Sequence, residues 1–495
     1  MIAYRSKMNL CILVTSIFIL IEIILALCPA SEELITFNKY LSCLFLVWSY
    51  MVAYISKKGF FYPYTLFLIS FTTFIYSRLI MDVMGLHSFD EGGAFSHVFY
   101  FTHEVKHRII LAISFATLFL TLGALCAFKK SAKTSIRPLE ETFFTKVMGK
   151  CGLCLIVISI LPFLILKVKL AMDIASNGYA WLYMDGGIKS NMSLADKMLD
   201  LSDNVFYMGT YLYFATYPKG RLYKFILLLF VVGSVLELGS GQRGTTIIQL
   251  FFVLTYCGCR GLRLSLKKVF AFSLLFFFFL YFSFVFATAR NSSLSNMGSV
   301  EIGALSQVAE IFFWQQGVTL DLVVGETIRM EDQLPNQALY VFNPFYAFLF
   351  GSPLSDLLGI RTYHPFIQNK DKVEKSWGLG AKLMYNIDAV SYYNGAGTGS
   401  SLVAEAYCFG GLIGVSVWSF LFMYYPLIFW EKYRNDPAIF FLLIVGLGGW
   451  YYSPRSEMLS FVGRVFQALI FISGIILLVR YVPRKKVRMA NKTRI

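Results

Sequence analysis

Charged residues are scarce in this sequence. Asp, Glu, Lys and Arg make up 15% of its 495 residues, whereas they make up about a quarter of a typical soluble protein. A large soluble core does not account for this deficit, because single cores stop growing at ~250–300 residues. Since 57% of the residues are hydrophobic, lipid is the expected solvent for much of the surface.

The signatures of several function classes are missing. The sequence has no P-loop and no dinucleotide-binding fingerprint, which argues against ATP-driven transport by this chain alone. The nine cysteines lie mainly in apolar segments, a pattern that does not indicate a disulfide framework. Four of the five histidines (His87, His97, His103 and His107) lie close together, but their spacing is not that of a metal site. Neither a metal nor another cofactor is therefore expected.

The net charge of +15 does not indicate nucleic-acid binding. No basic domain with interleaved aromatic residues is present, and most lysines and arginines lie in short gaps between apolar runs. The 49 Phe and 30 Tyr residues fit a membrane protein with aromatic belts at its interfaces. The expected surroundings are a lipid bilayer.

The apolar runs predict twelve transmembrane helices, each needing ~20 mostly apolar residues. The first run resembles a signal sequence, but it is long enough to span the bilayer and is expected to be retained. The fold class is therefore an all-α polytopic membrane protein. The expected spans are 8–28, 34–55, 60–84, 108–128, 147–170, 203–217, 222–239, 244–258, 268–289, 401–430, 437–452 and 458–482.

The positive charges predict the orientation. With the N-terminus in the cytoplasm, every strongly basic gap and the basic C-terminal tail fall on the cytoplasmic side. The chain then divides into nine spans over 1–289, a large outer loop over 290–400, and three spans with a cytoplasmic tail over 401–495. A loop of that length between two spans is usually functional.

Three arginines fall on the expected outer side, where the positive-inside bias disfavours them. Arg243 lies in the tight turn between spans seven and eight, Arg290 closes span nine, and Arg455 lies between spans eleven and twelve. An arginine kept at this edge of the membrane needs a partner.

Two interpretations account for these arginines. In the first, they snorkel or form ion pairs with Glu237 or Glu457. In the second, Arg243, Arg290 and Arg455 together bind an anion at the outer leaflet. A diphosphate suits arginine because the planar guanidinium makes bidentate, charge-assisted hydrogen bonds.

A glycine-rich segment over residues 394–414 leads from the large loop into span ten. Ser400 or Ser401 is expected to cap this helix, whose N-terminus adds partial positive charge on the outer side. Glu405, one turn further, either pairs with an outer arginine or acts as a base. Close helix packing is predicted by the small residues Gly410, Gly411 and Gly414.

The large loop contributes further candidates. His364 is its only histidine and is a second candidate base, although an ordinary loop histidine is the alternative interpretation. The aromatic residues Trp377, Tyr392 and Tyr393 are candidates for stacking on sugars, and anchoring at the membrane interface explains them equally well.

Three of these motifs together are similar to the O-antigen polymerase (Wzy) family of bacterial inner membranes. They are Ser240-Gly-Gln-Arg-Gly-Thr-Thr246, Gly399-Ser-Ser-Leu-Val-Ala-Glu-Ala-Tyr407 with the glycines that follow, and Tyr452-Ser-Pro-Arg455. The many spans and the one large periplasmic loop also fit. The resemblance implies a GT-C-like fold and a glycosyltransferase of lipopolysaccharide biosynthesis that needs no metal or nucleotide.

The resemblance also implies the substrates. The donor would be a glycan on undecaprenyl diphosphate, transferred to the non-reducing end of a repeat unit on a second undecaprenyl diphosphate. Direct attack would invert the anomeric configuration. Family arginines in the matching turns correspond to Arg243 and Arg455 as diphosphate-binding residues, and a chain-length regulator is an expected partner.

Three other classes of membrane protein are alternatives to a polymerase. A lipid-linked oligosaccharide flippase should carry charges deep inside several spans, whereas the notable charges here lie at the outer edge. A chain-length regulator usually has two spans and a long coiled loop, which does not match. An O-antigen ligase is the closest enzymatic alternative, and the sequence separates it poorly from a polymerase.

Overall fold

The computed structural model describes residues 2–56, 58–89, 93–94, 97–98, 101–131, 142–188, 192–239, 243–261, 305–352, 355–356 and 358–481. These residues are helical or irregular, apart from one antiparallel pair of two-residue strands, β1 (Gly93–Ala94) and β2 (His97–Val98). The predicted all-α class is confirmed for this part of the chain.

The N-terminal half is built from long helices and one interrupted helix. The interruption is the π-helical turn η1 (Thr72–Tyr76), which joins α3 (Pro63–Phe71) to α4 (Ser77–Val83). The other helices are α1 (Ile2–Ala26), α2 (Glu32–Ile55), α5 (His103–Ser131), α6 (Phe143–Asn177), η2 (Tyr179–Leu182), α7 (Leu194–Ala215), α8 (Leu222–Gly239) and α9 (Arg243–Cys259).

The expected outer loop folds into short helices, and three long helices follow it. The short helices are α11 (Leu305–Gln316), η4 (Thr319–Gly325), α12 (Glu326–Arg329), η5 (Glu331–Gln333), η6 (Gln337–Phe342), α13 (Asn343–Phe350), α15 (Lys370–Lys375), α16 (Leu379–Ile387) and α17 (Ala389–Tyr393). The C-terminal elements are α18 (Leu402–Tyr433), α19 (Pro437–Tyr452), η7 (Ser453–Arg455) and α20 (Phe461–Tyr481).

Within the described residues, seven helices are long and apolar enough to cross a membrane, and the protein is a multi-pass membrane protein. A helix is favoured there because it satisfies every backbone polar group internally, where no water is present. The seven are Tyr4–Ala26, Pro63–Val83, His103–Ser131, Phe143–Ile174, Leu402–Tyr433, Pro437–Arg455 and Phe461–Arg480. Each overlaps an expected span, and the expected span 268–289 lies outside the described residues.

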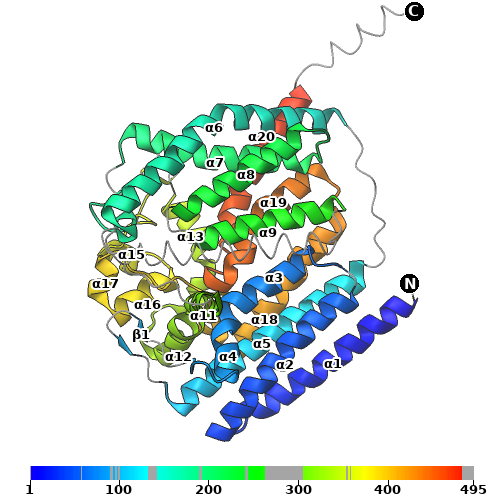
Figure 1. Ribbon diagram of the computed structural model, residues 1–495, viewed down its shortest axis with the longest axis vertical. Helices are drawn as coiled ribbons and strands as arrows, with labels where there is room; N and C mark the ends of the chain where they lie inside the picture. The colour runs from blue at the N-terminus through cyan, green and yellow to red at the C-terminus, as the bar shows by residue number, and fades with distance from the viewer. Residues whose placement is uncertain are drawn as a thin grey trace, which may run out of the picture.

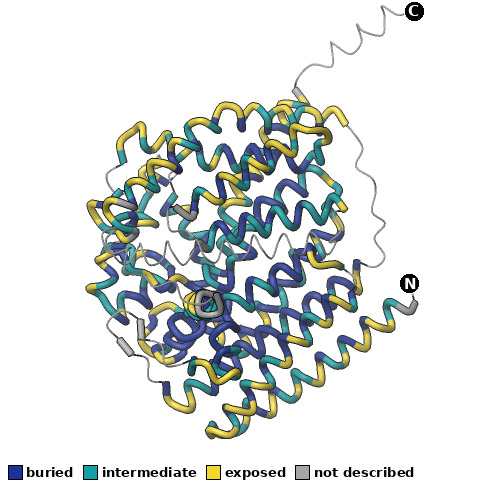
Figure 2. The backbone as a smooth tube through the Cα atoms, viewed as in Figure 1, coloured by how far each residue is buried: buried dark blue, intermediate teal, exposed yellow. Residues whose placement is uncertain are grey.

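The helices run across the molecule between two ends (Figure 1). The helix α1 begins at one end, and α15, α16 and α17 gather at the opposite end. The helix α5 lies inside and is buried along most of its length, while exposed residues follow α1 and α6 at the periphery (Figure 2). Exposed side chains on α6 such as Val157, Ile158 and Leu161 are apolar, as lipid-facing residues should be.

Small residues allow the long helices to approach closely. A Cβ on Gly123 of α5 would lie 2.6 Å from the carbonyl oxygen of Phe420 in α18. A Cβ on Gly152 of α6 would lie 2.9 Å from the carbonyl oxygen of Gly209 in α7. Any larger side chain at Gly123 or Gly152 would therefore force the backbones apart.

The glycines of α18 have a different role from the predicted one. Gly410 (φ −179°, ψ 39°) and Gly411 (φ 58°, ψ −143°) interrupt the helix, and a Cβ on either would meet no atom within 4 Å. The prediction of close helix packing is therefore wrong for Gly410 and Gly411. A Cβ on Gly414 would lie 2.3 Å from the carbonyl oxygen of Ala406, so the close approach there is to the chain's own backbone across the break.

Candidate functional site

The three sequence motifs meet around residues 452–458, the junction segment between α19 and α20. A Cβ on Gly244, at the start of α9, would lie 2.5 Å from the Tyr452 hydroxyl. Glu405 of α18 accepts a hydrogen bond through Oε2 from the backbone N–H of Met458 at 2.9 Å. Segments separated by some two hundred residues of sequence therefore share one place in the fold.

The glycine-rich loop before α18 lies directly on the junction segment. Gly399 has a positive φ of 76°, and a Cβ on it would lie 3.3 Å from the carbonyl oxygen of Arg455. On the other side, a Cβ on Gly380 of α16 would lie 2.2 Å from the carbonyl oxygen of Gly399. The loop thus needs glycine because the backbone has a left-handed conformation and is packed on both sides.

Glu405 connects this loop to the junction segment. Its side chain is fully buried, and its Oε1 accepts a hydrogen bond from the Ser400 hydroxyl at 2.6 Å. Ser401 is the N-cap of α18 and accepts a hydrogen bond from the backbone N–H of Val403, which confirms the predicted cap. Both Glu405 oxygens are therefore hydrogen-bonded, and no ion pair with an arginine is present among the described residues.

Arg455 projects from η7 toward the segment between α11 and η4. Its Nη1 donates to the Thr319 hydroxyl at 3.0 Å and to the Gln316 carbonyl at 3.3 Å. The alternative that Arg455 pairs with Glu457 or Glu237 is wrong in the part of the chain described, because no carboxylate there lies within ion-pair distance of it. Within the described residues its charge is met by neutral acceptors alone, which leaves it suited to an external anion.

A further arginine at this place was missed by the sequence analysis. Arg78 of α4 is 5% exposed and forms an ion pair with Asp321 of η4. Its Nε donates to the Trp314 carbonyl at 3.0 Å, and its guanidinium lies 4.1 Å from the Trp314 ring centroid. Arg78 and Arg455 are close enough to repel each other electrostatically.

The sequence did carry a signal for Arg78. It is an arginine within the third expected span, 60–84, and ionisable residues inside spans usually have a partner and a function. Its partner, Asp321, lies 243 positions away. The sequence alone does not show this pair, because α4 and η4 lie side by side only in the folded protein.

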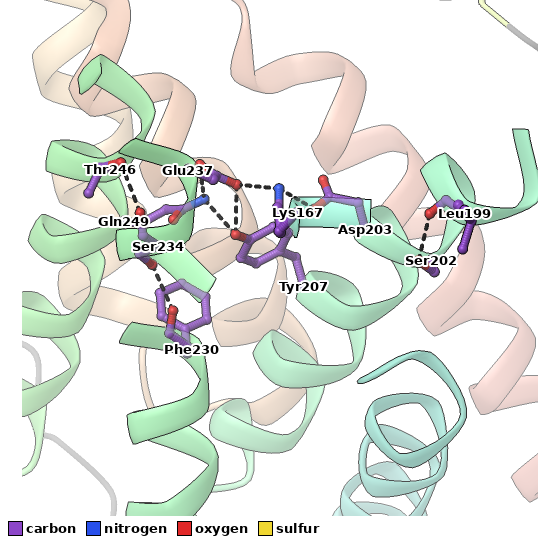
Figure 3. Close-up of polar contacts among 10 residues, drawn as sticks. All are labelled: Lys167, Leu199, Ser202, Asp203, Tyr207, Phe230, Ser234, Glu237, Thr246 and Gln249. Atoms are coloured by element: carbon purple, nitrogen blue, oxygen red, sulfur yellow. Dashed lines mark hydrogen bonds and ion pairs between the residues drawn. The ribbon is translucent and has the colours of Figure 1, made fainter. Parts of the chain in front are cut away.

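A buried polar network supports the hairpin of α8 and α9 (Figure 3). Lys167 of α6 forms ion pairs with Asp203 and Glu237, both at 2.7 Å. Glu237 also accepts hydrogen bonds from the Tyr207 hydroxyl at 2.8 Å and from Gln249 Nε2 at 3.0 Å. Four helices are joined in this way, and Arg243 is the first residue of one of them, α9.

A second group of polar and aromatic residues borders the junction segment. The half-buried Glu457 accepts a hydrogen bond through Oε1 from Asn343 Nδ2 at 2.5 Å. Burial raises the pKa of Glu457 above its usual value. Burial also lowers the pKa of Lys372 in α15 to about 8, although the nearby Glu457 carboxylate attracts its ammonium group.

Comparison with known proteins agrees with this convergence of motifs. The profile of one family, described as O-antigen polysaccharide polymerase Wzy, matches residues 8–486. The chain belongs to this Wzy family. No curated protein and no solved structure matches it. Membership makes the protein a glycan-polymerising membrane enzyme that acts on lipid-linked repeat units.

The other predicted diphosphate-binding residues of this Wzy protein are placed only in part. Arg243 is the first residue of α9, next to the Gly244 that touches Tyr452, but its side chain is not described. Arg290 lies outside the described residues. Diphosphate binding by Arg243, Arg290 and Arg455 remains a prediction.

His364, the second predicted base, lies in the loop between α13 and α15. It is half-buried, and its Nδ1 accepts a hydrogen bond from the backbone N–H of Phe366 at 3.3 Å. Among the described residues, no group of three or more His, Cys, Asp and Glu side chains is placed to hold a metal ion. His87, one of the four histidines that lie close together in the sequence, pairs with Glu310 at 2.7 Å.

The predicted sugar-stacking residues have different surroundings. Trp377 is half-buried and stacks on Tyr346 with ring centroids 4.2 Å apart. Tyr393 is 41% exposed. Tyr392 is fully buried and donates its hydroxyl hydrogen to the Asn369 carbonyl at 3.1 Å, an arrangement that suits packing better than contact with a sugar.

Proposed function

We propose that this Wzy protein transfers a growing glycan from undecaprenyl diphosphate to the non-reducing end of a new repeat unit. The acceptor is itself carried on undecaprenyl diphosphate, and the reaction takes place at the periplasmic face of the inner membrane. The observation that best supports this is the convergence of the three motifs on the junction segment, where Arg455 has no carboxylate partner among the described residues.

The chemistry requires positive charge at the leaving group. When the anomeric carbon–oxygen bond breaks, the electron pair moves to the lipid diphosphate. A fixed donor aimed at that developing charge contributes about 3 kcal/mol of transition-state stabilisation. Arg243, Arg290 and Arg455 are proposed to supply such donors. Arg78 is proposed to add to the positive potential beside Arg455, while Asp321 holds it in place.

No metal is required in this scheme, because arginines take the place of a divalent cation on the diphosphate. A single direct attack by the acceptor hydroxyl inverts the anomeric configuration. His364 and Glu405 are the bases predicted from the sequence. The two hydrogen bonds to Glu405 favour a positioning role for it, in which it holds the loop before α18 against the junction segment.

The proposed membrane topology has about twelve spans and a GT-C-like arrangement. The seven candidate spans are joined by α2, α7, α8 and α9 and by residues 268–289, which together make twelve. Both termini then lie in the cytoplasm, and residues 290–400 lie in the periplasm. Trp377 and Tyr393 would meet the glycan there.

Arg455→Ala tests the proposed anion site. We expect loss of long O-antigen chains, with single repeat units left on lipid A core, because the leaving diphosphate loses a donor. Arg455→Lys should also polymerise poorly, since an ammonium lacks the bidentate geometry. Lipopolysaccharide banding of a complemented deletion strain measures both. Arg243→Ala should give the same single-unit product.

Arg361→Ala is the matched control, because Arg361 is a loop arginine paired with Asp356, and its banding should be normal. Long chains in the Arg455→Ala strain would refute the diphosphate assignment. In the deletion strain, core with one repeat unit indicates a polymerase. Bare core with lipid-linked polymer would indicate a ligase, and lipid-linked units retained inside the cell would indicate a flippase.

A further inference from the structure

We propose that Glu457 is the catalytic base that takes the proton from the acceptor hydroxyl, and that the aromatic group beside it binds the acceptor sugar. The aromatic group consists of Tyr346, Tyr363 and Trp377. The inference rests on the proposed polymerase function and adds to it a catalytic residue and an acceptor site.

The junction segment carries both halves of the proposed chemistry. Glu457 follows Arg455 by two residues, so a carboxylate and a cation project from one short irregular stretch between α19 and α20. Their side chains have separate partners, since Arg455 contacts Gln316 and Thr319 while Glu457 contacts Asn343. The segment therefore offers one place for the leaving diphosphate and another for the acceptor. In a direct displacement the attacking hydroxyl and the leaving diphosphate lie on opposite sides of the anomeric carbon, so a base and an anion site are both needed around it.

The Glu457 carboxylate is held in position by a hydrogen bond to only one of its two oxygens. Asn343 Nδ2 donates to Oε1 at 2.5 Å, and the side chain stays half-buried. Within the described residues, Oε2 has no hydrogen bond of its own, and Lys372 attracts the carboxylate without forming an ion pair within 4.0 Å. One oxygen is thus oriented, and the other is available to a hydroxyl.

The aromatic group shares an element with the residue that orients Glu457. Asn343 and Tyr346 lie three positions apart on α13, so they occupy one face of that helix. Tyr346 stacks on Trp377 at 4.2 Å and on Tyr363 at 6.1 Å between ring centroids. Tyr363 in turn interacts electrostatically with Glu457. A sugar lying on this group would present its hydroxyls to the carboxylate.

The two bases predicted from the sequence are less suited to the role. Glu405 is fully buried and both its oxygens already accept hydrogen bonds. His364 uses Nδ1 to accept the backbone N–H of Phe366. Glu457 is partly exposed and has only one oxygen hydrogen-bonded among the described residues, unlike Glu405.

The proposed reaction is a single displacement in which Glu457 accepts one proton. The Glu457 carboxylate takes the proton of the acceptor hydroxyl, and the hydroxyl oxygen forms a bond to the anomeric carbon of the donor. The bond from that carbon to the diphosphate oxygen breaks, and its electron pair leaves with undecaprenyl diphosphate. The proton on Glu457 is released to water before the next transfer.

The groups that face Glu457 determine the pH dependence. They are Asn343 from α13, Tyr363 from the loop, Lys372 from α15 and Glu405 from α18, with Arg455 on the same segment. A base must be deprotonated, so kcat should rise with pH through the raised pKa of Glu457.

The test uses the purified full-length protein with undecaprenyl-diphosphate-linked repeat units. Glu457→Gln should lower kcat by about 100-fold or more, with the KM and the binding of undecaprenyl diphosphate unchanged. Its residual activity should lack the acidic limb of the pH profile, and Glu457→Asp should recover part of kcat. Trp377→Ala should instead raise the KM for the repeat unit about tenfold.

Glu374→Gln is the matched control, because Glu374 is an exposed carboxylate of α15 in the same loop, and its kinetics should equal those of the wild type. Wild-type kcat in Glu457→Gln would overturn the inference. So would a loss of kcat accompanied by equal losses of product binding and thermal stability, because that pattern is structural. If the wild-type protein itself made no polymer, the proposed function would fail instead.

Discussion

Arg78 illustrates how much a single charged residue depends on its partner. A cation with 5% exposure is stable only if an anion and hydrogen-bond acceptors replace its water. Asp321 supplies the anion and the Trp314 carbonyl supplies an acceptor. In contrast, Arg455, next to it, has only neutral acceptors within the described residues. Arg78 is therefore anchored by its ion pair, whereas Arg455 is available to a ligand.

Asp321→Asn tests the anchored arginine. It keeps the volume of the side chain but leaves Arg78 charged and without its counter-ion, which should cost about 3–5 kcal/mol. Unfolding of the purified protein in detergent measures the loss. Asp356→Asn, in a partly exposed pair with Arg361, is the control and should cost no more than about 1 kcal/mol. Equal effects of the two substitutions would contradict the structural role given to Asp321.

The break in α18 lets its two pieces contact different parts of the fold. The first piece carries Glu405 and lies against the junction segment, and the second piece continues along α5. Gly411 makes the change of direction possible, because its φ of 58° with ψ of −143° is a conformation that residues other than glycine rarely adopt. The short N-terminal piece can therefore follow the loop while the long piece follows the bundle.

Gly411→Ala should destabilise the protein by about 1–3 kcal/mol through backbone strain alone, since an added Cβ would meet no atom within 4 Å. Gly410→Ala is the control at the adjacent position, because it also has open space and its φ of −179° is extended. It should be nearly neutral. The unfolding midpoint in detergent distinguishes them, and a tolerated Gly411→Ala would mean that the break is not needed.

At the scale of the whole molecule, the two ends have different chemistry. The short helices α15, α16 and α17 lie at the end opposite the start of α1 (Figure 1). The last turn of α5 carries Lys129 and Lys130, and such basic ends favour the cytoplasm. In the proposed orientation, α15 and the Glu457 carboxylate that attracts its Lys372 belong to the periplasmic end, where the expected substrates would be.

Cysteine labelling tests this orientation. In a variant without the nine native cysteines, Glu374→Cys in α15 should react with a membrane-impermeant maleimide in intact cells. Lys129→Cys in α5 should react only after the membrane is permeabilised, because it lies on the basic side. The reverse pattern would place the junction segment in the cytoplasm and refute the proposed orientation.

The sequence by itself determined the class of the protein, its motifs and its family. Membrane spanning follows from local composition, because about twenty apolar residues form a helix in lipid whatever their neighbours are. The Ser401 cap and the three motifs are likewise short-range features. The predicted close packing at Gly410 and Gly411 failed because a glycine pattern alone does not distinguish a packed helix from a broken one.

Only the tertiary structure decided which of these residues meet. Arg78 pairs with a residue 243 positions away, and Asn343 orients a carboxylate 114 positions away. The exposure of Glu457 and the double hydrogen bonding of Glu405 also come from contacts between distant elements. Side-chain partners depend on how helices pack, and packing at this range leaves no periodic signal in a single sequence.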